Sequence, residues 1–240
     1  MKKGLLTGCN AEQEWMLKWW WENYSKYNNY PVTFCDFGMS LGARKWCETK
    51  GNVLPFDPKS ISTDKNHSAP WSDKVSLSTL NKRSVWFSKP LILSQSPYEK
   101  TLWTDVDCEI LKDIAPLFEM TECKDGFAIA YDTVENTKHA RKYNLLKDNV
   151  QVLQAGVIVF KKTSPVIPAW IDHCLKHIDT EVSDQTALSH LFAKRPFDIT
   201  ILSNKYNWLI SEFSSEHIAI IHHTGASRKR KLLSEMKFHG

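Results

Sequence analysis

Short apolar runs alternate with segments of helical periodicity along almost the whole chain, and this alternation restricts the fold more than any other feature. The chain opens with an apolar run at 4–8, a helical pattern at 11–27, a second run at 31–40, a helix capped by Ser40, and a third run at 51–56. Alternating strands and helices are typical of a parallel sheet with helices on its faces. The start of the chain therefore predicts an α/β fold.

The same alternation continues to the C-terminus. Further strands are predicted at 100–107, 126–132, 152–162, 198–203 and 218–225. Further helices are predicted at 84–96, 113–120, 168–178 and 183–194, with Ser183 as an N-cap and Pro90 only in a first turn or at a kink. We expect one domain over residues 1–240 with a mostly parallel central sheet and a basic C-terminal tail from about residue 227.

Composition places the chain among globular proteins and excludes several classes. The net charge is only +4, so the overall field does not favour binding to nucleic acid. No stretch approaches the roughly 18 apolar residues of a membrane span, and the first apolar stretch is too short for a signal peptide. The six cysteines include no closely spaced pair, which favours buried free thiols in a reducing compartment. We therefore expect a cytoplasmic protein.

Two aspartates end the apolar run at 100–107. Asp105 and Asp107 are two positions apart, so in an extended chain both side chains point to the same side. Two neighbouring carboxylates repel each other unless one takes up a proton or a cation lies between them. Carboxylate oxygens suit Mg²⁺ and Mn²⁺, which substrate phosphates commonly complete. The triplet alone leaves two interpretations open, a solvated acidic turn and a metal site.

A second unusual segment lies near the C-terminus, where the apolar run at 218–221 leads into two histidines, a glycine and a basic cluster. An imidazole from His222 beside carboxylates suits Mn²⁺ better than Mg²⁺. Gly225 permits close approach of the backbone to a ligand, and Arg228 with the cations after it could bind a diphosphate. The alternative is a surface histidine pair followed by a solvated basic tail.

Five short motifs in order resemble glycosyltransferase family 8 of the GT-A fold, the group of glycogenin and of bacterial lipopolysaccharide glycosyltransferases. They are TGCN at 7–10, LWTDVDCEIL at 102–111, LQAGVIVF at 153–160, SDQTALS at 183–189 and HHTGASR at 222–228. The second is similar to the metal motif of that family, and the last is similar to its pattern of histidine, glycine and lysine. The resemblance covers most of the chain and implies a metal-dependent GT-A glycosyltransferase.

The resemblance also implies a role for each residue that falls on a motif. Asp105, Asp107 and His222 are expected to bind Mn²⁺ or Mg²⁺, which acts as a Lewis acid for the departing nucleotide. The residues expected around the nucleoside and diphosphate of a UDP-hexose are Thr7, Cys9, Asn10, Asp36, Lys89, Gly225 and Arg228. Those expected around the transferred sugar are Asp132, Gln154, Asp184 and Gln185. The expected acceptor is a hydroxyl group of a glycan or glycolipid.

The sequence departs from the family pattern at three of these places. Gln154 stands where asparagine is usual, and Arg228 stands where lysine is usual, without the proline and tryptophan that follow in the family. Cys108 directly follows the metal triplet. These departures leave the fold prediction unchanged. They leave the identity of the sugar, and whether its anomeric configuration is retained, open.

Two other functions are compatible with parts of the pattern. A nucleotidyltransferase that acts on sugar phosphates also uses paired carboxylates, but it normally has a phosphate loop rich in glycine and lysine. The segment TGCNAEQEW at 7–15 has one glycine and no lysine. A non-catalytic protein that binds nucleotide sugars or glycans would not need Asp105, Asp107 and His222 together. Their joint presence favours an enzyme.

Three features outside the motifs carry weaker expectations. The polar segment 57–82 is too long for a plain connection and indicates a functional loop or lid, in which Trp71 either stacks on a sugar or has no such role. His173 and His177 share one face of a predicted helix, but the absence of a third ligand nearby in sequence disfavours a metal site. The basic tail could contact an anionic membrane surface peripherally through Lys229, Arg230 and Lys231.

Overall fold

The computed structural model describes residues 2–61, 63, 71–76, 80–147, 150–209 and 217–238. The strands are β1 (Lys3–Cys9), β2 (Val32–Asp36), β3 (Asn52–Pro55), β4 (Lys100–Thr104), β5 (Cys108–Ile110), β6 (Phe127–Tyr131), β7 (Leu153–Lys161), β8 (Thr200–Ile201), β9 (Trp208–Leu209) and β10 (Ile220–His222). The α-helices are α1 (Leu17–Tyr27), α2 (Leu41–Glu48), α4 (Arg83–Leu93), α5 (Ala115–Glu119), α6 (Val134–Lys142), α7 (Val166–Lys176), α8 (Asp184–Lys194) and α9 (Ala226–Phe238). Short 3-10 helices are η1 (Glu14–Met16), η2 (Pro58–Ser60), η4 (Met120–Glu122) and η5 (Asn204–Tyr206).

A seven-stranded sheet forms the centre of the molecule, in the order β3-β2-β1-β4-β7-β6-β8. Its strands pair in parallel except at β7, which runs antiparallel to both β4 and β6. A second, smaller sheet has the order β5-β10-β9. The predicted α/β class with a mostly parallel sheet is therefore confirmed.

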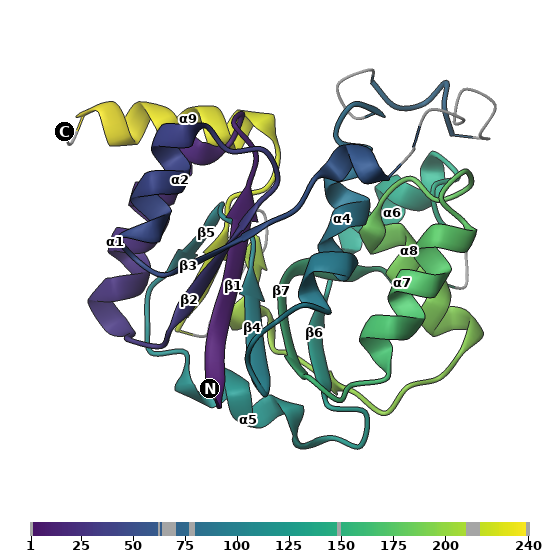
Figure 1. The fold of residues 1–240 in the computed structure, drawn as a ribbon. Coiled ribbons are helices and arrows are strands. Elements are labelled where there is room, and N and C mark those ends of the chain that lie inside the picture. Colours follow the sequence, from purple (N-terminus) through teal and green to yellow (C-terminus); the bar gives the residue numbers. More distant parts are fainter. Residues whose placement is uncertain are drawn as a thin grey trace.

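Alternation of side chains along each strand divides the core into two clusters on opposite faces of the sheet. Leu5 of β1 and Leu102 of β4 pack with residues of α1 on one face. Their neighbours Leu6 and Trp103 pack with residues of α4, α7 and α8 on the other face. Figure 1 shows α1 and α2 on one side of the sheet and α4, α7 and α8 on the other. Both faces are covered, as the unbroken apolar runs of the sequence require.

Both predicted helix caps are present. The Ser40 hydroxyl accepts a hydrogen bond from the backbone nitrogen of Ala43 at 3.2 Å. The Ser183 hydroxyl accepts from the backbone nitrogen of Thr186 at 3.2 Å, and the Thr186 hydroxyl accepts in return from the backbone nitrogen of Ser183 at 3.0 Å. This reciprocal cap makes α8 begin at Asp184, so Asp184 and Gln185 lie on its first turn.

Pro90 lies in the second half of α4 rather than in its first turn. Proline lacks a backbone N–H, so one intrahelical hydrogen bond is missing there. Burial of Phe87, Ile92 and Leu93 on the same helix offsets that loss. Part of the predicted loop or lid at 57–82 lies outside the described residues, and its role stays a prediction.

The basic segment from residue 227 belongs to helix α9 and is not an extended tail. The helix is held because Leu232 is buried and Met236 packs against the core. The six cysteines are free thiols, and all except Cys123 are buried, as predicted. Among the described helices, none combines the length and apolar character that crossing a membrane requires.

Candidate functional site

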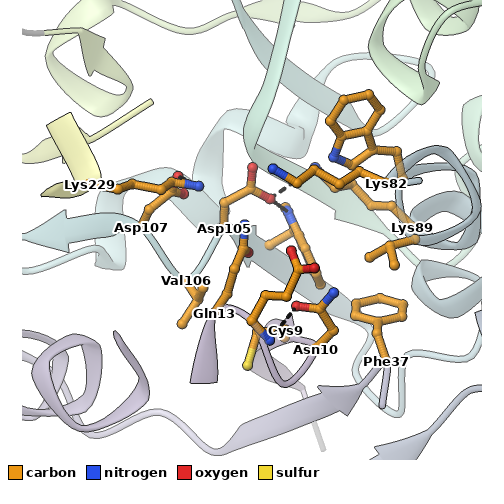
Figure 2. A pocket seen from close by; sticks show the side chains of 15 residues that line it. Cys9, Asn10, Gln13, Phe37, Lys82, Lys89, Asp105, Val106, Asp107 and Lys229 are labelled. Atoms are coloured by element: carbon orange, nitrogen blue, oxygen red, sulfur yellow. Dashed lines mark hydrogen bonds and ion pairs between the residues drawn. The ribbon is translucent and has the colours of Figure 1, made fainter. Parts of the chain in front are cut away.

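Predicted site residues from distant parts of the chain meet at the carboxyl ends of β1 and β4. A pocket lies there, between these strand ends, one face of α4 and the start of α9 (Figure 2). Its lining residues are Gly8, Cys9, Asn10, Glu12, Gln13, Phe37, Lys82, Val85, Trp86, Lys89, Trp103, Asp105, Val106, Asp107 and Lys229. Open α/β sheets bind ligands at this edge, because the loops after the strands converge there.

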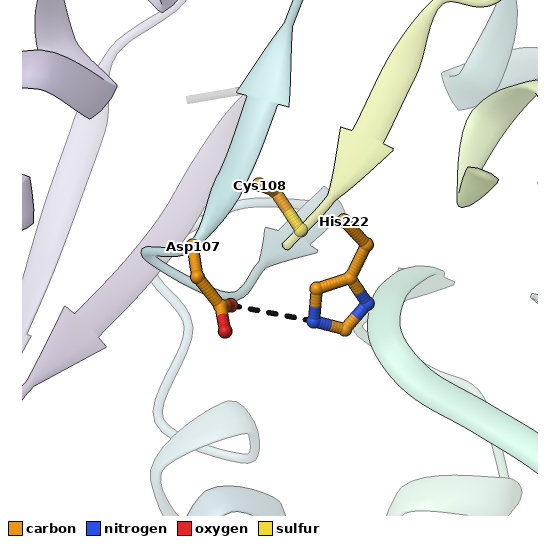
Figure 3. A group of neighbouring side chains, drawn as sticks. All are labelled: Asp107, Cys108 and His222. Carbon is orange, nitrogen blue, oxygen red and sulfur yellow. Dashed lines mark ion pairs between the residues drawn. The ribbon is translucent and has the colours of Figure 1, made fainter. Parts of the chain in front are cut away.

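Strand pairing in the small sheet brings His222 to the paired aspartates. β10 runs antiparallel to β5, with His222 opposite Cys108. The Nε2 atom of His222 lies 3.3 Å from Oδ1 of Asp107 and 3.8 Å from Oδ2 of Asp105. Asp107, Cys108 and His222 offer potential ligand atoms that all lie within 4.8 Å of one another (Figure 3). Residues more than a hundred positions apart thus form one compact buried group.

The imidazole of His222 is oriented by Asn207, which follows η5. The Nδ2 atom of Asn207 donates to the backbone carbonyl of Gln154 at 3.3 Å, so its Oδ1 faces Nδ1 of His222, at 3.0 Å. An amide oxygen can only accept, and therefore Nδ1 carries the proton of this bond. Nε2 is then the ring nitrogen that faces the two aspartates.

A glycine in β7 makes room for that imidazole. A Cβ atom added to Gly156 would lie 2.0 Å from Cε1 of His222, far inside van der Waals contact. The pairing of β6 with β7 shifts register between Ile129 and Ala130, close to the same place. Strand irregularities of this kind are common next to functional sites, because they re-aim side chains and backbone groups.

The carboxylate of Asp105 lies outside the compact group. Its Oδ1 accepts hydrogen bonds from Nζ of Lys89 at 2.9 Å and from Nε1 of Trp103 at 2.8 Å. Asp107 is paired as well, since its Oδ2 lies 2.8 Å from Nζ of Lys229. Each of the two aspartates thus has an ammonium group of its own.

The surroundings set the protonation of the compact group. Burial acts to raise the pKa of Asp107, but His222 and Lys229 outweigh it and hold that pKa well below its usual range. Burial raises the pKa of the Cys108 thiol well above its ordinary value, and Asp107 adds to the effect. The thiol is therefore protonated, and its sulfur donates to the backbone carbonyl of Gly156 at 3.7 Å. The carboxylate of Asp107 and the imidazole of His222 are therefore the candidate ligands of the group.

These two ligands fit a hard divalent ion. Oxygen and nitrogen atoms about 2.1 Å from one ion, at right angles, lie about 3 Å apart. The observed 3.3 Å between Asp107 and His222 is close to that separation. A carboxylate with an imidazole could therefore hold a divalent metal ion, whose identity stays a prediction.

Lys89 links Asp105 to Asp184 and to the backbone of β7. Its Nζ also donates to the backbone carbonyl of Ala155 at 3.1 Å and lies 3.7 Å from Oδ2 of Asp184. Burial acts to lower the pKa of Lys89, but Asp105 and then Asp184 outweigh it and raise that pKa. Burial raises the pKa of Asp184 to about 6, against the opposing effect of Lys89.

The other predicted sugar-side residues form one hydrogen-bonded network. Oδ2 of Asp132 accepts from Nε2 of Gln185 at 2.9 Å and from Nε2 of Gln154 at 3.4 Å. Gln185 and Gln154 in turn accept from the backbone nitrogens of Ala155 and Gly156, each at 3.1 Å. The sequence separates these side chains widely, and the structure brings them to one edge of β7.

The residues predicted around the nucleoside and diphosphate are only partly brought together. Cys9 and Asn10 line the pocket, whereas Thr7 and Asp36 are absent from the described lining. Oδ1 of Asp36 accepts from the backbone nitrogens of Gly38 at 2.9 Å and Met39 at 2.7 Å, in the turn after β2. The carboxylate of Asp36 thus shapes this turn.

Of the neighbouring residues Arg228 and Lys229 of α9, Lys229 lines the pocket and the predicted Arg228 does not. Gly225 has a φ of +83°, in the left-handed region that favours glycine, and starts the turn into α9. Arg228 donates to the Thr224 hydroxyl at 3.3 Å. Lys229, one residue further along the helix, lines the pocket beside Asp107. Sequence reasoning grouped Lys229 with the membrane-facing cations, and it gave no signal for Asn207 because no motif covers residues 204–209.

Two features outside this site are structural. Trp71 is buried, its Nε1 donates to the backbone carbonyl of Thr180 at 2.8 Å, and the Arg83 guanidinium lies over its ring. It therefore packs inside the molecule, and a contact with a sugar stays a prediction. His173 lies 3.2 Å from Glu181, and its ring is next to that of His177 without forming a compact ligand group in the described chain.

Comparison with known proteins shows the fold. No family profile and no curated protein sequence matches this chain. Mouse xyloside xylosyltransferase 1 matches it with a TM-score of 0.60 and 14% identity, over 92% of this chain and 97% of that one. The galactosyltransferase LgtC, solved with donor and acceptor sugar analogues, matches with a TM-score of 0.59 and 14% identity, over 92% and 87%.

A third similar structure is the glycosyltransferase GlyE of Streptococcus pneumoniae, with a TM-score of 0.61 and 14% identity, over 93% of this chain and 55% of that one. All three are glycosyltransferases and all match over more than nine-tenths of this chain. The α/β architecture of this chain, with its seven-stranded and mostly parallel sheet, is therefore the fold of the GT-A glycosyltransferases of the family 8 type.

Proposed function

We propose that this chain is a metal-dependent glycosyltransferase that moves a hexose from a UDP-sugar to a hydroxyl group of a glycan or glycolipid. The observation that carries the proposal is the convergence of Asp107, His222 and Asp105 beside Lys89 in one pocket. A carboxylate and an imidazole at bonding separation, with cations beside them, suit a divalent ion and a diphosphate. The shared fold with known glycosyltransferases supports the same assignment.

In this proposal, Asp107 and His222 hold Mn²⁺ or Mg²⁺, with Asp105 as a third ligand. When bound, the ion supplies Lewis-acid neutralisation of the diphosphate. Transfer breaks the bond between the sugar C1 and the diphosphate oxygen, so negative charge develops on the departing UDP. Lys89 and Lys229 line the pocket and add positive charge where that charge develops.

The network of Asp132, Gln154 and Gln185 is assigned to the transferred sugar. Its carboxylate and amide groups suit sugar hydroxyls, which both donate and accept hydrogen bonds. The backbone of β7 fixes both glutamines, so the network is held in place before a sugar binds. Asp184 is joined to the diphosphate side through Lys89. Cys9 and Asn10 are assigned to the nucleoside because they line the same pocket.

The test is thermal unfolding with UDP, with and without Mn²⁺, on the wild type and on Asp107→Asn. Bound ligand raises the unfolding temperature in proportion to RT ln(1 + [L]/Kd). At UDP about a hundredfold above its Kd this gain is about 2.7 kcal/mol, or several degrees. We expect this rise in the wild type only with Mn²⁺ present. In Asp107→Asn the rise should be absent, because one ligand is lost.

Asp172→Asn is the matched control, because Asp172 is an exposed residue of α7 that pairs with Lys176. It should show the full wild-type rise. A rise of equal size in Asp107→Asn would remove Asp107 from the site. If UDP produced no rise in any of the three proteins, the UDP-sugar donor would be wrong.

A further inference from the structure

The two aspartates of the site are each neutralised from within the chain, by lysines from different helices. Nζ of Lys89, on α4, lies 2.9 Å from Asp105, and Nζ of Lys229, on α9, lies 2.8 Å from Asp107. These ammonium groups stand where a divalent ion would otherwise balance the carboxylates. His222 faces Oδ1 of Asp107 and Lys229 binds Oδ2, so a cation that binds Asp107 beside His222 meets the positive charge of Lys229 on the same carboxylate.

The two lysines are held differently. Lys89 is buried and is also bonded to the carbonyl of Ala155 and close to Asp184, so it has partners that remain when Asp105 turns away. The side chain of Lys229 is 26% exposed, and in the described part of the chain its ion pair is with Asp107. Lys89 is a fixed part of the site, whereas Lys229 can leave Asp107 by rotating its own flexible side chain.

Arg228 and Lys231, on the same helix, are paired elsewhere and do not line the pocket. Arg228 is directed to Thr224, and Lys231 is 78% exposed and lies 3.8 Å from Glu235 of the same helix. The helix itself is anchored through Leu232 and Met236 against the core. Movement of Lys229 therefore requires no displacement of α9.

We propose that Lys229 is an internal counter-ion that the metal displaces from Asp107 and that then binds the diphosphate of the donor. The inference rests on the proposed function. A metal on Asp107 repels the neighbouring ammonium, and the diphosphate attracts it within the same pocket. Metal binding without nucleotide is weakened by the loss of the ion pair. Metal binding with nucleotide is strengthened, so the two ligands bind cooperatively.

The experiment measures Mn²⁺ affinity from the EPR signal of free Mn²⁺, with and without UDP, and needs no turnover. The proteins are the wild type, Lys229→Met and Lys229→Arg. Methionine keeps the apolar stem and removes the charge, whereas arginine keeps the charge. Lys231→Met is the matched control, since it removes the same charge from the same helix at a residue that does not reach the site.

Without UDP, Lys229→Met should bind Mn²⁺ about tenfold more tightly than the wild type, because no ion pair has to be broken. The factor by which UDP increases the Mn²⁺ affinity of Lys229→Met should be about one-tenth of the factor in the wild type. Lys229→Arg should behave like the wild type, and Lys231→Met should change either affinity by less than about twofold.

Two results would overturn the inference, and they differ in what they leave standing. If Lys229→Met and Lys231→Met gave the same Mn²⁺ affinities with and without UDP, Lys229 would not compete with the metal, and the proposed metal site would still hold. If none of the proteins bound Mn²⁺ with or without UDP, the metal of the proposed function would be wrong and the inference would fall with it.

Discussion

The availability of His222 as a ligand depends on a single buried amide, Asn207. The amide bonds the carbonyl of Gln154 on one side and Nδ1 of His222 on the other, so it fixes both the ring orientation and the tautomer. The pair is buried, so loss of either bond leaves a polar atom without water to replace its partner. In the proposed metal site, Asn207 therefore acts as a positioning residue for His222.

We expect Asn207→Leu to weaken Mn²⁺ binding by about 10- to 100-fold, the usual effect of losing such a supporting bond. Leucine keeps the size of the side chain but cannot accept from Nδ1 of His222. The Kd for Mn²⁺, measured by EPR on folded protein, checks the prediction. Asn23→Leu is the control, because Asn23 bonds the carbonyl of Trp19 within α1, away from the site. Equal Kd values for both variants would show that His222 needs no support.

The contribution of Asp184 to the stability of the folded chain depends on pH. Its pKa of about 6 in the folded chain lies above the ordinary 3.8, so the folded state binds this proton more tightly than the unfolded state. The folded state gains this advantage at low pH and loses it as pH rises from about 4 through about 6. At neutral pH the folded chain therefore contains a buried, ionised carboxylate. Its ionisation lowers the free energy of unfolding by at most about 3 kcal/mol.

Asp184→Asn should accordingly raise the unfolding temperature by a few degrees at pH 7.5, while the difference should shrink towards pH 4.5. Asparagine removes the ionisation, and Lys89 keeps Asp105 as a partner. Scanning calorimetry at the two pH values checks this. A difference that stayed constant between them would mean that Asp184 is not the titrating group.

At the scale of single elements, β7 is the strand on which the site depends most. The Gln154 side chain donates a hydrogen bond to Asp132, and the backbone carbonyl of Ala155 accepts one from Lys89. Gly156 lies against the ring of His222. The register shift opposite β6 makes these contacts compatible with one strand. Two structural requirements therefore explain the motif LQAGVIVF. Its apolar side chains are buried on both faces of the sheet, and Gly156 leaves space for the ring of His222.

Gly156→Ala should abolish Mn²⁺ binding and destabilise the fold by about 1–3 kcal/mol, since its methyl group would occupy the place of the His222 ring. Mn²⁺ affinity below the unfolding transition and the unfolding temperature together check this. Gly42→Ala, on helix α2, is the control, because the nearest atom to an added Cβ there is the Ser40 hydroxyl oxygen, 3.9 Å away. Wild-type Mn²⁺ affinity in Gly156→Ala would contradict the proposed position of His222.

At the scale of the whole molecule, the sheet order explains why the site forms where it does. β1 and β4 are neighbours in the sheet although residues 10–99 lie between them in the sequence. Cys9, Asn10 and Asp105, at or just after the carboxyl ends of these strands, therefore line one pocket. The small sheet then adds His222, and α9 adds Lys229. Two core clusters on opposite faces of the sheet hold these parts together.

The sequence predicted the features that are local. Strand and helix positions follow from the periodicity of apolar residues, and the caps at Ser40 and Ser183 act within one turn, so both could be read from neighbouring residues. Asp105, Asp107 and His222 could be selected because the types of their side chains restrict their chemistry. The class of fold followed from the order of these elements, and the structure confirms it.

Only the tertiary structure decided which side chains meet. A step of one residue along a helix turns a side chain by about 100°, so the sequence could not tell whether Arg228 or Lys229 faces Asp107. Asn207 and the burial of Trp71 depend on partners far away in the chain, which no local pattern records. The residue types and their order thus lie in the sequence, whereas the pairing of charges in the site arises from packing between distant segments.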